Sequence, residues 1–586
     1  MIDRVPDLTP TLGVSLLAVL LTACASLHPH KTPPPVTPQG DATALTVMAE
    51  ADLKRGDCRA ASETYAKAAA VGDAKLARRA TQVAMACEHL PAAWQAATRW
   101  RALAPGDREA DALYAAVALK LYRTADARAA IHDFWHIEEQ QDAAPAAPAP
   151  AAPDATAPPR GAARATKSMT ELTALLLEES DAPAVLIAMS GALEPTANSP
   201  ETLTLLGELA LAAYDGQRAQ TYAQRALQHD PKDPAALRVL ARAYVMRGNA
   251  LQAVATARRA EADDATRGGF EVAEIYASLD RSEEAHQQLE HLRAGGAPQG
   301  EIDRRLALLA FDSGDMKEAR QRFQDLLSNG EGNDAAQLYL ADISARDGDP
   351  DAAIAGYRRL YDSSVALSAR SRAAALLLDK SKRTEALALL DDYATEHPED
   401  ELDLTLAKAR LLADHGEADS GLALLSEALD RHPQHPSIEY DRAVILEQAG
   451  HVHESVEALE HMLTERPDDP TLLNALGYTL ADHTLELSHA EGLIRRALVL
   501  MPDNPAALDS LGWVRYRQGD VKDAVSTLER AYTLDHDGEI AAHWGEVLWV
   551  NGQRSEARKV FAEALAREPD SKPLKTTIKR LLPDGQ

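Results

Sequence analysis

The stretches Leu508-Asp509-Ser510-Leu511-Gly512-Trp513 and Asp523-Ala524-Val525 decide the fold. They contain two small residues, Gly512 and Ala524, twelve positions apart. The same interval recurs along the chain, with a third small residue seven positions further on: Gly207, Ala219 and Ala226; Ala241, Ala253 and Ala260; Gly545, Ala557 and Ala564. About eleven such units lie between Pro200 and Asp570, with a period close to 34 residues, which is typical of repeat proteins.

Small residues at this spacing are what two crossing helices need. A bulky side chain would hold closely packed helices apart, so Gly or Ala is favoured at the crossing. One helix pair cannot bury its apolar face alone, whereas a stack of pairs can. A left-handed turn between the two helices of a unit favours glycine, and the predicted turn glycines are Gly248, Gly314, Gly348, Gly416, Gly450, Gly519 and Gly552. The sequence therefore predicts an all-α solenoid of stacked helix pairs.

The unit resembles the tetratricopeptide repeat (TPR), and the stretches 508–513 and 523–525 are especially similar to that family. The resemblance implies a TPR superhelical solenoid whose first helices line a concave groove. TPR arrays bind many unrelated partners, so the resemblance implies a binding protein without naming its partner.

Composition narrows the classes of partner. The chain of 586 residues is 46% hydrophobic but only 4% aromatic, and its formal net charge is −29. A protein that binds nucleic acid is usually basic, so we expect no nucleic-acid partner. An acidic surface repels anionic lipid, so attachment to a membrane would need something other than charge.

The N-terminus offers such an attachment. The apolar run from Leu12 to Leu21 is too short to span a bilayer, and it leads into Leu21-Thr22-Ala23-Cys24, which looks like a bacterial lipobox. The resemblance implies a signal peptide over 1–23 and lipidation of Cys24. The alternative is an ordinary secretory signal with a chance cysteine, and the acidic residues Asp3 and Asp7 depart from the usual positive start.

The residues after Cys24 suggest where the protein is anchored. By resemblance to Gram-negative lipoprotein sorting, Ala25 implies the periplasmic face of the outer membrane. The lipidated N-terminus and a Pro-rich tether occupy 24–41 and would hold the folded part away from the lipid. No later segment is apolar enough to predict a transmembrane helix.

About three degenerate helical repeats are predicted over 42–140, and they contain the other two cysteines, Cys58 and Cys87. Both lie near predicted turns on one edge of the stack. A disulfide between them is possible in the oxidising periplasm and would stabilise the fold by roughly 3 kcal/mol. The alternative is two buried free thiols that pack as small apolar residues.

Two further segments differ from the array. Residues 141–166 are rich in Pro and Ala, which predicts an extended linker or surface loop that separates an N-terminal module from the main solenoid. A partial repeat follows over 168–199, and the eleven units occupy 200–570. Residues 571–586 are predicted to form an amphipathic C-terminal capping helix, with a basic docking helix as the alternative.

We find no pattern that predicts catalysis. His453-Glu454 begins a zincin-like spacing, but position 457 is Glu rather than His. His132 and His136 share a predicted helix face, which is more often incidental than a metal site. We expect no enzyme activity, no catalytic or metal-binding residues, no cofactor and no small-molecule substrate.

A partner-binding groove is the remaining candidate site. Repeat positions place an aromatic and polar row on the first helices of the last units: Tyr440, Asn474, Tyr478, Asp509, Trp513, Tyr516, Glu546 and Trp549. Such a row suits an extended peptide or a partner helix. For Trp513 the alternative, packing between neighbouring first helices, is equally compatible with the sequence, whereas Tyr478 and Trp549 favour the groove.

The lipobox, degenerate N-terminal repeats and long C-terminal array together resemble outer-membrane TPR lipoproteins that serve as adaptors for a periplasmic carboxyl-terminal processing protease. That resemblance implies binding and activation of a serine protease and recruitment of peptidoglycan hydrolases as its substrates. Two alternatives remain. One is an assembly lipoprotein for a secretin, pilus or exopolysaccharide export machine, and the other is a peptidoglycan enzyme with an unrecognised site.

Overall fold

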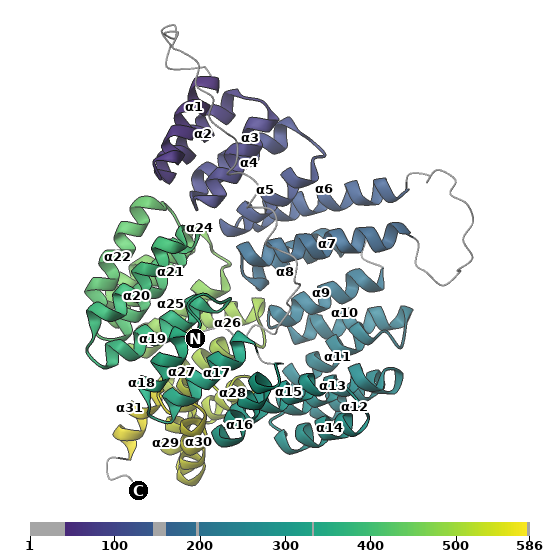
Figure 1. The fold of residues 1–586 in the computed structure, drawn as a ribbon, viewed down its shortest axis with the longest axis vertical. Coiled ribbons are helices and arrows are strands. Elements are labelled where there is room, and N and C mark those ends of the chain that lie inside the picture. Colours follow the sequence, from purple (N-terminus) through teal and green to yellow (C-terminus); the bar gives the residue numbers. More distant parts are fainter. Residues whose placement is uncertain (1–41, 144–159, 195–198, 331–332, 583–586) are drawn as a thin grey trace. The chain divides into compact units, whose positions relative to one another are not determined.

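A computed structural model describes residues 42–143, 160–194, 199–330 and 333–582 (Figure 1). The predicted signal peptide, Cys24 and the tether lie outside these residues. The described chain contains 31 α-helices and no strand, so the predicted all-α fold class is confirmed. Consecutive helices are antiparallel partners that stack on the next pair along the array, as Figure 1 shows.

The first eight helices form four pairs. These are α1 (Ala42–Lys54) with α2 (Cys58–Val71), α3 (Ala74–Ala86) with α4 (Leu90–Leu103), α5 (Arg108–Lys120) with α6 (Thr124–Ala143), and α7 (Arg160–Glu179) with α8 (Ala182–Leu193).

Eleven further pairs occupy the segment predicted to hold eleven units. They are α9 (Pro200–Ala212) with α10 (Gly216–His229), α11 (Pro234–Met246) with α12 (Ala250–Asp263), α13 (Ala265–Ser278) with α14 (Ser282–Ala294), α15 (Gln299–Asp312) with α16 (Met316–Ser328), α17 (Asp334–Arg346) with α18 (Pro350–Arg358), α19 (Ala366–Asp379) with α20 (Arg383–Glu396), α21 (Glu401–Asp414) with α22 (Ala418–Arg431), α23 (Pro436–Gln448) with α24 (Val452–Glu465), α25 (Pro470–Asp482) with α26 (Leu487–Leu500), α27 (Pro505–Gln518) with α28 (Val521–Leu534), and α29 (Gly538–Val550) with α30 (Arg554–Arg567). A single 3-10 turn, η1 (Pro398–Asp400), precedes α21.

The small residues lie where the two helices of a pair cross. Ala241 and Ala253 are fully buried. A Cβ added at Gly545 of α29 would overlap the ring of Phe561 of α30, and one added at Gly207 of α9 would come within 2.8 Å of a methyl carbon of Val239 on α11, the first helix of the next unit. The seven predicted turn glycines all have positive φ values, between 71° and 93°. Both features follow from the helix crossing and the tight turn that the repeat requires.

Many first helices begin with a proline that follows a capping residue. Proline opens α9, α11, α23, α25 and α27, where its missing N–H would have no partner in any case. The preceding residue caps several of these helices, as Asp233 and Asn504 do by accepting hydrogen bonds from the backbone N–H groups of Ala235 (3.0 Å) and Ala507 (2.9 Å). Proline and cap together fix where each first helix starts.

The structure differs from the prediction at the linker 141–166. Helix α6 continues to Ala143 and α7 already begins at Arg160, while 144–159 lies outside the described residues. One apolar core runs without a break from Ala97 to Ala243 and includes Met169 and Leu176 of α7. The first helices are therefore continuous with the main array rather than a separate module, because α7 buries its apolar face against its neighbours. Helices α7 and α8 occupy the segment where a partial repeat was expected, and α8 packs mainly against α6 rather than against α7.

Helix α31 (Lys572–Leu581) lies at the C-terminal end of the array, where a cap was expected. Its Leu574 is fully buried in the same core cluster as Ile540 of α29, whereas Lys572, Lys575 and Lys579 are exposed. This helix therefore covers the apolar end of the stack with a basic outer face.

Cys58 and Cys87 are joined by a disulfide, with Cα atoms 5.4 Å apart. Cys58 is the first residue of α2 and Cys87 caps the C-terminal end of α3. The bond therefore ties the start of one helix to the end of the next. Within the described residues, no helix is both long enough and apolar enough to cross a membrane.

The helix crossings predict the effect of adding a single methyl group. Gly545→Ala places a Cβ against Phe561 and should lower the free energy of unfolding by about 1–3 kcal/mol. Gly492 of α26 is the matched control, because it is exposed and a Cβ there meets nothing within 4 Å. Gly492→Ala should raise stability by roughly 0.5–1 kcal/mol through helix propensity. Thermal unfolding measures both, and equal effects of the two substitutions would contradict close packing at Gly545.

Candidate partner-binding surface

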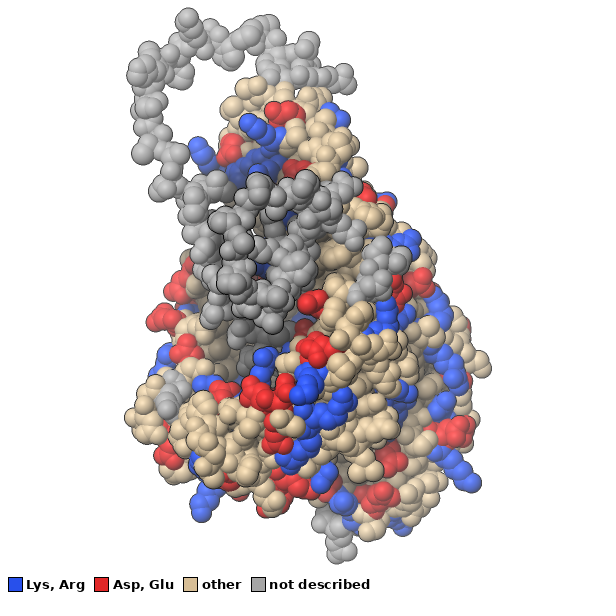
Figure 2. All heavy atoms as spheres, turned by 90° about the vertical axis from the view of Figure 1, so that its right-hand side faces the viewer, with Lys and Arg blue, Asp and Glu red and all other residues tan. Residues whose placement is uncertain are grey.

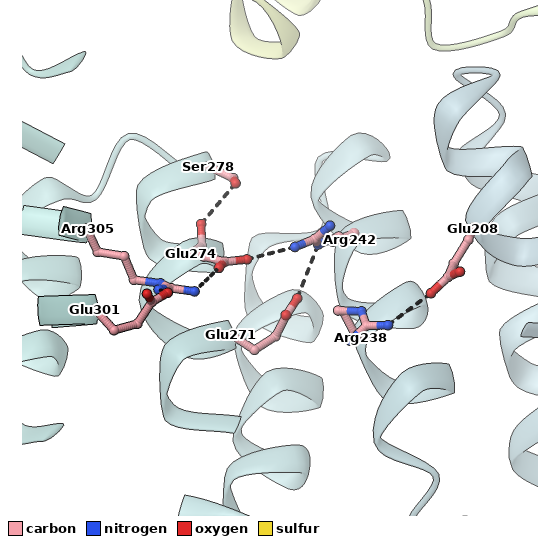
Figure 3. Close-up of polar contacts among 8 residues, drawn as sticks. All are labelled: Glu208, Arg238, Arg242, Glu271, Glu274, Ser278, Glu301 and Arg305. Atoms are coloured by element: carbon pink, nitrogen blue, oxygen red, sulfur yellow. Dashed lines mark hydrogen bonds and ion pairs between the residues drawn. The ribbon is translucent and has the colours of Figure 1, made fainter. Parts of the chain in front are cut away.

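Charged side chains join neighbouring first helices across the face that these helices form. In α9 to α15, Arg238 pairs with Glu208 (2.9 Å) of the preceding unit. Arg242 reaches forward to Glu271 (3.2 Å) and Glu274 (2.7 Å) of the next unit. Figure 3 shows how these side chains form a row that Arg305 continues by contacting Glu274 and Glu301.

Pairs of the same kind recur elsewhere in the described residues: Glu50–Arg79, Arg78–Glu109, Asp342–Arg372, Arg410–Asp441 and Glu546–Arg580. Figure 2 likewise shows acidic and basic side chains interspersed over the visible face rather than segregated. Exposed pairs contribute little stability. They do neutralise one another and hold adjacent helices in register, so most of these charges are already engaged within the chain.

The first helices α25, α27 and α29 carry a different arrangement, which we call the C-terminal cluster. The Trp513 ring stacks on His543, with ring centroids 4.1 Å apart, and its Nε1 donates to Asp482 Oδ1 (3.0 Å). His543 Nδ1 lies 2.9 Å from Asp509 Oδ2. The Tyr478 hydroxyl donates to Glu539 (2.8 Å), two units further along. Aromatic stacking and charged hydrogen bonds therefore join three successive units.

The cluster shifts the titration of its members. Burial opposes a positive charge on His543, but the neighbouring Asp509 outweighs it and raises the pKa of the imidazole to about 9. Burial raises the pKa of the Glu539 carboxyl, even though His543 opposes the rise. At neutral pH the cluster therefore contains a buried imidazolium paired with Asp509.

The predicted groove residues divide into two groups. Asp509, Trp513 and Glu546 are buried, at 5%, 5% and 7% exposure, so Trp513 packs between neighbouring first helices, the alternative recognised from the sequence. The other five residues are only partly buried: Tyr440, Asn474, Tyr478, Tyr516 and Trp549.

Not all of these residues meet. Tyr478, Asp509 and Trp513 join the C-terminal cluster, and the Tyr516 hydroxyl donates to Glu546 (3.2 Å) beside it. Trp549 instead lies against Arg554 and Arg558 of α30, each 5.1 Å from its ring centroid. Trp549 therefore faces the second helix of its own unit rather than the cluster.

Asp482, Glu539 and His543 are cluster members that the sequence reasoning missed. A signal existed for one of them, because His543 lies 34 residues after Asp509, which is one repeat period. Two buried polar groups one period apart on first helices predict a direct contact.

Asn474 of α25 offers an unused hydrogen-bond acceptor. Its Oδ1 is buried without a hydrogen-bond partner among the described residues, although the side chain as a whole is only half-buried. It lies one helical turn before Tyr478, and buried polar groups are normally paired.

Two other groupings of polar side chains occur among the described residues. His132 and His136 contact each other through their Nε2 atoms (3.0 Å) on the exposed side of α6. Glu447, Asp482 and His483 have ligand-type atoms within 4.8 Å of one another, but His483 is exposed and already contacts Glu447 (2.7 Å). Neither grouping identifies a metal site by itself. Arg101 lines a surface cavity of about 560 Å³. Its guanidinium donates a hydrogen bond to Asp111 (2.7 Å), so this charge is already paired within the chain.

The His543–Asp509 pair predicts a pH dependence of stability. Its stabilisation is complete below pH 6.5, the ordinary pKa, and is lost as the pH rises through about 9. The full effect is at most about 3 kcal/mol. His543→Gln should remove this dependence, whereas His461→Gln, at an exposed site on α24, should leave it unchanged. Thermal unfolding between pH 6 and 10 measures it, and identical pH profiles for wild type and His543→Gln would refute the pairing.

Comparison with known proteins identifies the repeat. Residues 304–364, 406–470 and 487–539 match one tetratricopeptide-repeat family profile, and 210–268 match another. The TPR repeat-containing protein PA4667 of Pseudomonas aeruginosa is 33% identical over 213 residues, which is 36% of this chain and 36% of that protein. The chain thus matches about a third of the length of this relative.

Two solved structures are also similar. TTC0263, a TPR protein from Thermus thermophilus, is 23% identical and covers 30% of this chain and 97% of its own, with a TM-score of 0.28. The APC/C hetero-tetramer Cut9–Hcn1 is 14% identical and covers 93% of this chain and 99% of its own, with a TM-score of 0.29. With the matched repeats and the helix pairs described above, the fold is an all-α TPR superhelix.

Proposed function

We propose that this protein is a non-catalytic, lipid-anchored scaffold that binds a periplasmic carboxyl-terminal processing protease and brings peptidoglycan hydrolases to it. The TPR fold supports the general part of this proposal, because such arrays ordinarily bind other proteins. The lipobox before Cys24 supports an outer-membrane anchor facing the periplasm. The protease and its substrates come from the resemblance to adaptor lipoproteins.

The C-terminal cluster is the observation that carries the binding role. Asn474 and Tyr478 are half-buried neighbours on one first helix, and Asn474 has an unpaired acceptor. A tyrosine ring and a side-chain amide one helical turn apart, both partly buried, suit an extended partner segment. The Tyr478 ring lies beside His543, which stacks on Trp513, so the position of the tyrosine is fixed before a partner arrives.

Charge favours a partner segment with a cation. The cluster and its border contain four carboxylates, Asp482, Asp509, Glu539 and Glu546, against three cations, His543, Arg517 and Arg580. The surplus of one negative charge lies on the partly buried face of α25 to α29. A lysine or arginine in the bound segment would balance it and steer association.

The mechanism would be proximity. Fifteen helix pairs give a long array that is able to contact a protease and its substrate at the same time. Holding both on one scaffold converts a bimolecular encounter into an intramolecular one and raises the effective concentration of substrate. No chemical step by the scaffold itself is required.

Cross-linking and mass spectrometry of the affinity-purified, membrane-anchored chain test the proposal. We expect a soluble periplasmic serine protease together with cell-wall hydrolases. Recovery of a secretin or a β-barrel protein instead would favour the assembly lipoprotein, and hydrolysis of purified cell wall by the protein alone would favour an enzyme. Either result contradicts the adaptor role.

The groove predicts a local effect on partner binding. Asn474→Ala combined with Tyr478→Ala should weaken binding of the captured protease at least about tenfold, because both side chains lie on one partly buried face of α25. Tyr276→Ala is the control, since Tyr276 is also a half-buried tyrosine on a first helix, α13, outside the cluster. Calorimetric titration compares them, with circular dichroism to verify folding. Equal loss in both variants would disprove a site at α25.

A further inference from the structure

Four contacts join turns of early units to segments of late units. Solenoid repeats ordinarily contact only their neighbours, yet these contacts bridge about half the chain: Glu88 with His435 (3.4 Å), the Tyr122 ring with Arg466 (5.1 Å), the Tyr214 carbonyl with the Asp503 N–H (2.9 Å), and Asp280 with Arg567 (2.7 Å). The array within Ala42–Gln586 is therefore fastened to itself.

The backbone at these turns is unusual. Glu88, Tyr122, Tyr214 and Asp280 have φ values between 50° and 57°, at inter-helix turns where most units have glycine. A non-glycine residue in this conformation costs of order 1 kcal/mol. Ser381 and Thr484 have the same backbone conformation, but among the described residues they make no contact of this long-range kind. At the four turns, the non-glycine residue with positive φ itself makes the long-range contact, and this contact offsets the cost of its backbone conformation.

The first of these contacts is built around the Cys58–Cys87 disulfide. His432 Nδ1 lies 3.2 Å from the carbonyl oxygen of Cys87, and both groups are buried. Arg59, the residue after Cys58, donates to the carbonyl of Asp430 (2.6 Å). Cys87 is part of one anchor and Cys58 is adjacent to another. Both anchors hold the same segment, 430–435, which comprises the end of α22 and the loop before α23.

Glu88, the residue after Cys87, strengthens this contact. Its carboxylate accepts from Lys120 Nζ (2.8 Å) and faces His435, which is only 4% exposed. On the other side of the loop, His432 Nε2 faces Glu401 (3.4 Å). The loop is therefore held by groups on α3 and on its own unit, and the α3 groups are held in turn by the disulfide.

We infer that the Cys58–Cys87 disulfide is a latch that holds the first helix pairs against the segment 430–435 of the late units, and that its reduction releases this contact. In the oxidised chain, the bond fixes the start of α2 relative to the end of α3, so that Arg59, Cys87 and Glu88 meet the loop together. Reduction frees these two helix ends and loosens all three anchors. The inference concerns the regulation of the array and does not depend on the identity of its partner.

A dithiol reductant supplies the two electrons and two protons that reduction of the disulfide requires. One thiolate of the reductant attacks Sγ of the half-buried Cys58, the S–S bond breaks, and the released Cys87 thiolate takes up a proton. The second thiol of the reductant then attacks the mixed disulfide and releases Cys58 as a thiol. The reductant leaves as a disulfide, and the chain has gained two electrons and two protons.

Hydrogen exchange on the full chain, measured by mass spectrometry, tests the latch. The chain has three cysteines, and Cys24 lies outside the bond, so a phosphine reductant acts on this disulfide alone. Reduction should speed exchange of the amides in 428–436 roughly three- to tenfold, as expected for the loss of about one net hydrogen bond. Small-angle scattering of the same samples should show a larger radius of gyration.

Matched variants distinguish a disulfide that holds the segment 430–435 from one that stabilises only α2 and α3. Cys58→Ser with Cys87→Ser should behave as the reduced wild type, and Arg59→Ala with His432→Ala should speed exchange in 428–436 while the disulfide stays intact. His461→Ala, at an exposed site on α24, should have no effect. If the serine variant fails to fold, reduced wild type and the anchor variant decide the question. Faster exchange confined to 55–90, with 428–436 unchanged, would overturn the inference.

Discussion

Close approach of two helices at small residues is the constraint on which the rest of the structure depends. Ala241 is fully buried, and a Cβ added at Gly512 or Gly545 would overlap the second helix of its own pair, so this closeness sets the distance and angle between the helices of each pair. Because the same crossing recurs about every 34 residues, each first helix lies beside the next at a constant spacing. That spacing is what permits side chains one unit apart to meet.

The face of the first helices uses this spacing in two ways. From α9 to α15 it is occupied by arginine–glutamate pairs that neutralise one another and keep the helices in register. From α25 to α29 it is occupied by aromatic rings over a buried His543–Asp509 pair, with Asn474 left unsatisfied. The first region is occupied by ion pairs between helices, whereas the second places the partly buried Asn474 and Tyr478 on the face of the first helices. This difference is why we place the candidate binding site in the late units.

Local features were predictable from the sequence and long-range ones were not. Turn glycines and crossing alanines follow from a repeat period, so Gly248 and Ala253 could be assigned without coordinates. Composition misplaced the ends of the linker 141–166, because Pro and Ala mark its middle but the helical periods of α6 and α7 extend into it. Contacts such as His432 with Cys87 and Gly216 with Asp503 join residues 345 and 287 apart, and no local pattern encodes these separations.

Site-specific photo-cross-linking in the membrane-anchored chain tests the central claim most directly. A photoreactive phenylalanine analogue is placed at Tyr478 on α25, or at Val499, a 74% exposed residue on the second helix α26 of the same unit. The account predicts that position 478 captures a periplasmic protease and position 499 does not. Equal capture from both positions, or capture of a secretin or β-barrel from position 478, would contradict it.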